Sequence, residues 1–140
     1  MPRFFQVTLA VTLLTVVAAF AADSPSNERD PLDGMQFEGM TGEKGKGDHH
    51  ADTITFRNGT FRSLDCENWG FGPASYTVEK KGDVVHFTST LVSPKRGRLE
   101  WKGKIIDGKA TATFRWKHER WYWNIDREYW FEGTPKTAQR

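Results

Sequence analysis

Apolar and polar residues alternate with a period of two through most of the chain after residue 34. Leu99, Trp101 and Ile105, for example, fall on one face of their segment, and charged residues fall on the other. Such alternation is typical of antiparallel strands that bury one face. The pattern predicts eight strands and no helix, with the strands over residues 35–40, 53–57, 60–64, 74–80, 84–92, 98–105, 109–117 and 124–133.

Two-residue turn signals join several of these segments. Asn58-Gly59 and Asp107-Gly108 combine residues that tolerate a positive φ, which a type I′ hairpin turn requires at both central positions. Consecutive hairpins make a meander, and closing the meander into a barrel leaves no edge strand unpaired. We therefore expect an all-β fold, a single antiparallel up-and-down β-barrel of about eight strands. An open sandwich is the alternative.

The beginning of the chain has the features of an export signal. Arg3 precedes an uncharged apolar run over residues 7–20, and Ala19-Phe20-Ala21 matches a small-x-small cleavage pattern. The run is too short for a membrane-spanning helix. We expect a periplasmic or secreted protein without a membrane anchor. Its expected parts are a signal peptide over residues 1–21, a flexible lead-in over 22–33, the barrel over 34–134 and a C-terminal tail over 135–140.

Composition narrows the class of function. The 140 residues are 37% hydrophobic and 14% aromatic, which excludes a wholly disordered chain and makes aromatic rings the main material for a core or a ligand site. The formal net charge of +2, together with the export signal, argues against a nucleic-acid partner. The single Cys excludes an intramolecular disulfide.

This arrangement resembles the lipocalin-like (calycin) barrels, which are small exported eight-stranded meanders that bind apolar molecules. More narrowly, the chain is similar to a group of small bacterial exported proteins without an assigned activity. The similarity covers residues 32–133 and is carried by residues 53–63, Cys66, and residues 69–72, 93–95, 101–103 and 128–133. It implies a barrel but no catalytic or ligand-contacting positions. The Gly-x-Trp near the first strand of lipocalins has no equivalent around residues 34–37.

The inward-facing positions and one Gly-rich loop are the candidate ligand contacts. Trp69 and Phe71 lie in that loop, which we expect at one end of the barrel. Small inward residues such as Gly103 and Ala112 would leave room inside, so we expect a cavity for one small apolar or aromatic ligand, oriented by polar groups such as Tyr76 or Arg127. The alternative is an interior filled by the same rings. The candidate contacts are Trp69, Phe71, Tyr76, Phe87, Trp101, Trp116 and Tyr129.

A second hypothesis is an interaction module that binds an envelope protein partner or polymer through exposed aromatic residues. It requires a different set of side chains on the surface, namely Trp69, Trp121, Trp123 and Trp130. A basic stretch over residues 95–120 could also offer a polyanion contacts at Arg115, Lys117, Arg120 and Trp121. The alternation, however, places most of these charges on the outer face of a strand, as in any solvated barrel.

No residue pattern indicates catalysis. His49-His50-x-Asp52 lacks further ligands at a spacing suited to a metal. Cys66 lies between Asp65 and Glu67, which raise the pKa of a thiol and so reduce its reactivity. Cys66 is therefore either a small buried residue or one half of an intermolecular disulfide. We expect a monomer with no enzyme activity, no metal and no cofactor.

Overall fold

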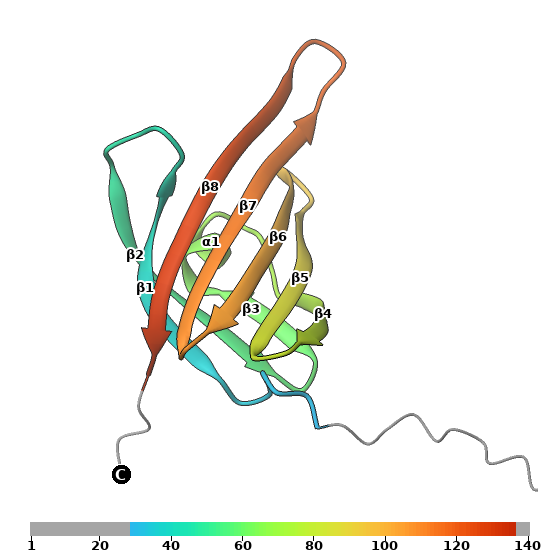
Figure 1. Cartoon of the computed structure of the whole chain (residues 1–140). Coiled ribbons are helices and arrows are strands. Elements are labelled where there is room, and N and C mark those ends of the chain that lie inside the picture. Colours follow the sequence, from blue (N-terminus) through green and yellow to red (C-terminus); the bar gives the residue numbers. More distant parts are fainter. Residues whose placement is uncertain (1–28, 137–140) are drawn as a thin grey trace, which may run out of the picture.

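The computed structural model describes residues 29–136, so the predicted signal peptide and most of the predicted tail lie outside the described residues. Eight antiparallel strands form one closed barrel in which each strand pairs with the next and β8 pairs with β1 (Figure 1). This confirms the up-and-down barrel and excludes the sandwich. The elements are β1 (Gln36–Glu43), β2 (His49–Arg57), β3 (Thr60–Ser63), α1 (Leu64–Asn68), β4 (Ala74–Lys81), β5 (Val84–Ser93), β6 (Gly97–Ile106), β7 (Lys109–Glu119) and β8 (Asn124–Pro135).

The two predicted hairpin turns have the expected backbone. Asn58 and Gly59 have φ values of 51° and 74°, and Asp107 and Gly108 have values of 50° and 74°. Positive φ at both central positions fits the right-handed twist of the flanking strands. Each turn therefore fixes the register of its hairpin, with Arg57 opposite Thr60 in the first one.

The helix α1 corrects the expectation of a helix-free chain, in which Cys66 belonged to a loop. The Ser63 side chain caps its first turn by accepting a hydrogen bond of 3.1 Å from the Cys66 backbone N–H. Asp65 and Glu67 lie in that turn, where acidic side chains stabilise the positive end of the helix dipole. The capping serine and the two acidic residues were the sequence signals for this helix.

Because the strands run up and down, their connections gather at two ends of the barrel (Figure 1). We call the end with the β2–β3, β4–β5 and β6–β7 turns the base. The other end, which we call the mouth, carries the β1–β2 and β5–β6 connections, α1 and the long β7–β8 hairpin. The connections at the mouth are longer than the two-residue turns at the base.

Aromatic rings fill the base of the barrel. Phe56 is fully buried, and its ring centroid lies 4.8 Å from that of Phe87 and 5.2 Å from that of Phe61. A Cβ atom added at Gly103 would lie only 2.4 Å from the Phe87 ring. The small residue at 103 therefore accommodates the Phe87 ring and leaves no empty space, contrary to the sequence expectation.

The chain before β1 also contributes to the core. Leu32, which the sequence assigned to a flexible lead-in, is only 1% exposed. The Gly34 N–H donates to the Phe56 carbonyl over 2.7 Å. Asp30 accepts a hydrogen bond from the Tyr76 hydroxyl. The packed part of the chain thus begins before residue 34.

Candidate ligand cavity at the mouth of the barrel

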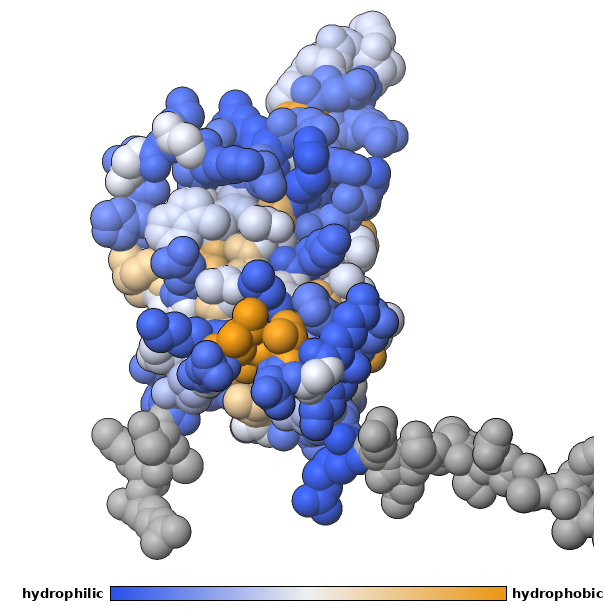
Figure 2. All heavy atoms as spheres, viewed as in Figure 1, coloured by the Kyte–Doolittle hydropathy of each residue, from blue (hydrophilic) through white to orange (hydrophobic). Residues whose placement is uncertain are grey.

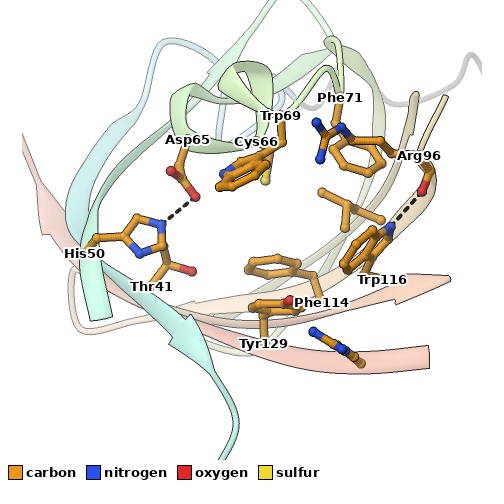
Figure 3. Close-up of a pocket in the computed structure, with 12 residues that line it drawn as sticks. Thr41, His50, Asp65, Cys66, Trp69, Phe71, Arg96, Phe114, Trp116 and Tyr129 are labelled. Carbon is orange, nitrogen blue, oxygen red and sulfur yellow. Dashed lines mark hydrogen bonds and ion pairs between the residues drawn. The ribbon is translucent and has the colours of Figure 1, made fainter. Parts of the chain in front are cut away.

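A cavity of about 290 Å³ lies inside the mouth (Figure 3). Its wall is formed by residues of the connections at the mouth and by inward-facing residues of the strands next to them. The lining residues are Thr41, His50, Asp65, Cys66, Trp69, Phe71, Arg96, Leu99, Phe114, Trp116, Arg127 and Tyr129.

Stacked rings form one wall of the cavity. The centroids of Phe114 and Tyr129 are 5.2 Å apart with an interplanar angle of 10°. On its other face Phe114 stacks on Trp101 at 4.1 Å and 11°. Trp101 is buried, whereas Tyr129 is half-buried at the cavity. The stack therefore extends from the buried Trp101 through Phe114 to Tyr129 at the cavity.

The loop after α1 forms the opposite wall. Phe71 is 3% exposed, and its N–H donates to the Cys66 carbonyl over 3.0 Å. Trp69 is exposed at the rim, with the Arg96 guanidinium carbon 5.3 Å from its ring centroid. The Trp116 indole N–H donates to the Arg96 carbonyl over 2.7 Å. These contacts join the α1–β4 loop, the β5–β6 turn and β7 around the opening.

Polar groups hold α1 over the mouth. The buried Asp52 carboxylate accepts hydrogen bonds from the Ser63 hydroxyl at 2.6 Å and from the Asp65 N–H at 2.9 Å. Burial raises the pKa of Asp52, and these two hydrogen bonds lower it in part. His50 Nε2 lies 2.8 Å from Asp65 Oδ2 at the cavity wall. The network fixes the helix to β2 and β3.

The Cys66 thiol borders the cavity but has low nucleophilic reactivity. Burial is the main cause that raises its pKa to about 12; the carboxylates of Asp52 and Asp65 also raise it, and the nearby Ser63 hydroxyl and Trp101 indole lower it. The thiolate is the nucleophilic form of cysteine, so a thiol that stays protonated at neutral pH is a poor nucleophile. Glu67, which the sequence also expected to act on the thiol, instead pairs with Arg62 at 2.6 Å.

Four of the seven sequence-predicted contacts line the cavity, namely Trp69, Phe71, Trp116 and Tyr129. The other three lie elsewhere: Phe87 is in the base core, Trp101 is behind Phe114, and Tyr76 donates its hydroxyl proton to Asp30. Of the two polar groups suggested to orient a ligand, Arg127 lines the cavity and Tyr76 does not. The site-residue prediction omitted the lining residues Thr41, His50, Asp65, Cys66, Arg96, Leu99 and Phe114.

The side chains of the His49-His50-x-Asp52 segment have separate partners. His49 contacts the Gly47 carbonyl at 3.2 Å and His50 pairs with Asp65, while Asp52 binds Ser63. Residues 29–136 hold no group of three or more His, Cys, Asp or Glu side chains able to bind a metal. Over the same residues, no helix has the length and apolar character needed to cross a bilayer.

The end of the β7–β8 hairpin extends beyond the mouth and stands clear of the remaining surface (Figure 2). Trp121 is 95% exposed, and Tyr122 and Trp123 are about half exposed, at 53% and 47%. Arg120 contacts two of these rings, with 2.8 Å to the Tyr122 hydroxyl and 5.7 Å to the Trp123 centroid. Trp130 is half-buried against Gly42, unlike the three other tryptophans expected at the surface.

Comparison of the chain with protein families, with curated proteins and with solved structures finds no match.

Proposed function

We propose that the protein binds one small apolar or aromatic molecule in the mouth cavity, as an exported binding protein of the lipocalin-like kind. The observation that carries the proposal is an open cavity walled by aromatic rings in a barrel whose other end is filled. Ligand sites are typically concave, mostly apolar, and supplied with a few polar groups. A volume of about 290 Å³ suits a ligand of one or two rings better than a long lipid chain.

The proposal includes export to the periplasm or the outside of the cell, since the apolar run over residues 7–20 has the features of a cleaved signal. It does not include catalysis. The thiol at the cavity is held protonated by burial. The Thr41 hydroxyl, opposite His50 in the register, donates to the Trp130 carbonyl, so no hydrogen bond links it to the His50–Asp65 pair.

Native mass spectrometry of the processed protein, purified from an exported preparation without detergent, tests the proposal. We expect an added small-molecule mass that is lost on denaturation. Trp116→Ala should reduce the bound fraction, because it removes a cavity wall. Val92→Ala, an exposed position outside the cavity, should retain the ligand. A bare mass for the parent protein, with no small molecule able to shift its melting temperature, would contradict the proposal.

A second candidate function is an interaction module that binds an envelope protein through the β7–β8 hairpin end. The 95% exposure of Trp121 favours it, because exposed Trp, Tyr and Arg side chains are common anchors of protein interfaces. This candidate predicts a bare native mass and indifference to Trp116→Ala. It also predicts loss of partner binding in Trp121→Ala, which the cavity proposal does not.

A further inference from the structure

We infer that the ligand of the mouth cavity carries a carboxylate or similar anionic head on its apolar or aromatic body. The inference rests on the proposed function and adds a charge requirement to it. The lining holds two guanidinium groups, Arg96 and Arg127, against one carboxylate, that of Asp65. The carboxylate already has a cationic or hydrogen-bonding partner in His50, 2.8 Å away.

Arg127 occupies an inward-facing position of β8. It shares its face with Tyr129 and the fully buried Phe131, and it lies opposite Trp116 in the register with β7. Within residues 29–136, Arg127 forms no ion pair. Its side chain is exposed at the mouth, where the guanidinium borders the cavity and can contact an anionic ligand as well as water.

The acidic neighbours of Arg127 along β8 are engaged elsewhere. Asp126 pairs with Arg115 at 2.9 Å, and Glu128 pairs with Lys44 at 3.1 Å. Both are on the other face of the strand, because side chains alternate along it. Burial and, after it, Glu43 raise the pKa of the Tyr129 hydroxyl, and the nearby Arg127 lowers it in part; Glu43 is not part of the lining. The carboxylates around Arg127 therefore leave its charge available to a ligand.

Arg96, at the rim of the cavity, likewise has a guanidinium without an ion pair in the described residues. Its guanidinium lies over the Trp69 ring, and its carbonyl is held by the Trp116 indole. Nearby Glu100 is already bound by Arg98 at 3.1 Å and by Lys117 at 3.0 Å.

The cavity is consequently polarised. Figure 3 shows the His50–Asp65 pair on one side and Arg96 on the other, with the rings of Trp69, Phe114 and Tyr129 between them. Guanidinium groups bind carboxylates through two parallel hydrogen bonds, and such charge-assisted bonds are stronger where water is partly excluded. A flat ring with a carboxylate would stack in the aromatic part and direct its anion toward the arginines.

A matched pair of probes tests the head group. We would titrate 2-naphthoate and its neutral analogue 2-naphthalenemethanol into the processed protein by isothermal calorimetry. We expect the acid to bind at least about tenfold more tightly than the alcohol, as one charge-assisted contact allows. Raising the salt concentration should lower the affinity for the acid and leave the affinity for the alcohol unchanged.

Two variants locate the effect. Arg127→Met keeps an apolar stem and removes the charge. We expect it to lower the affinity for the acid about tenfold and to change the affinity for the alcohol by less than about twofold. Arg57→Met is the matched control, because Arg57 is exposed near the base and likewise has no ion pair in the described chain. It should change neither affinity. Unchanged melting temperatures show that both variants are folded.

The outcomes separate the inference from the proposed function. Equal affinities of acid and alcohol, or a preference for the acid that survives Arg127→Met and Arg96→Met together, would overturn the anionic head group while leaving a binding cavity. Failure of both probes to bind at millimolar concentration would overturn the cavity as a site for such rings, and the head group with it.

Discussion

At the base of the barrel, the Phe56 ring is enclosed by the rings of Phe37, Phe61, Tyr76 and Phe87, all within 6.2 Å between centroids. At the mouth, by contrast, Trp69, Trp116 and Tyr129 border a cavity of about 290 Å³. The same residue types fill one end and line the other. Tight turns draw the strands together at the base, whereas α1 and longer connections surround the mouth. Changes at the two ends should therefore separate stability from ligand binding.

The largest expected effect is at the base. Phe56→Ala removes a fully buried ring and leaves a void, so we expect a loss of about 3–5 kcal/mol in the free energy of unfolding. Urea denaturation of the parent and variant measures it. A loss below about 1 kcal/mol would mean that the base can collapse around the void and is less rigidly packed than the contacts indicate.

Overpacking the base should cost less. Gly103→Ala places a Cβ atom 2.4 Å from the Phe87 ring and 2.8 Å from the Ala112 Cβ, so we expect a destabilisation of about 1–3 kcal/mol. Gly47→Ala is the matched control, because a Cβ there would meet nothing within 4 Å. If Gly103→Ala melts at the parent temperature, the base holds unfilled space and differs less in packing from the mouth.

The burial of Cys66 at the mouth can be tested through the pH dependence of stability. The pKa of Cys66 is raised from 9.0 to about 12 on folding, so between these values the unfolded chain loses this proton while the folded chain keeps it. The unfolded state then binds fewer protons, and stability falls as pH rises, by at most about 1.4 kcal/mol per pH unit from this group. Below about pH 9 the contribution is constant.

Denaturation of the parent and of Cys66→Ala at several values between pH 8 and 10.5 isolates this thiol from the tyrosines and lysines that titrate nearby. The variant should have the shallower slope. Identical slopes would show that water reaches the thiol and that the mouth is more open there than its 3% exposure implies.

The smallest effect is expected at the hairpin end. Trp121→Ala removes a side chain that is 95% exposed, so the free energy of unfolding should change by less than about 0.5 kcal/mol. Ligand affinity in the cavity should also be unchanged. Thermal unfolding and the naphthoate titration check both expectations, and a weaker affinity would show that the hairpin end folds over the mouth when ligand binds.

The barrel could be predicted from sequence because alternation and turn chemistry are local. Period-two runs gave the strands, and Asn58-Gly59 and Asp107-Gly108 gave two hairpins with the correct register. Closure followed because a long meander must pair its edges. The helix was missed, since an alternation pattern carries no signal for a five-residue helix that depends on the cap at Ser63.

The candidate site could be predicted only in part. Alternation shows that Phe87 and Trp116 face inward, but it does not show how far along the barrel axis each lies. Depth follows from which turns share an end, and this separates Phe87 near the base from Trp116 near the mouth. The inward position of Arg127 could have indicated the charge of the cavity, because the same parity buries Phe131.

The seam between β3 and β4 has the shortest register in the barrel, with only Thr60–Ser75 and Phe61–Ala74 as partners. Every other pair of neighbouring strands is joined over at least four partners. The sheet therefore opens most easily between residues 63 and 74, at the segment that contains α1. Two chains that exchanged β1–β3 would break these two partners and the seven between β1 and β8, the fewest for any exchange of consecutive N-terminal strands, so this seam is the hinge that a domain-swapped dimer would use.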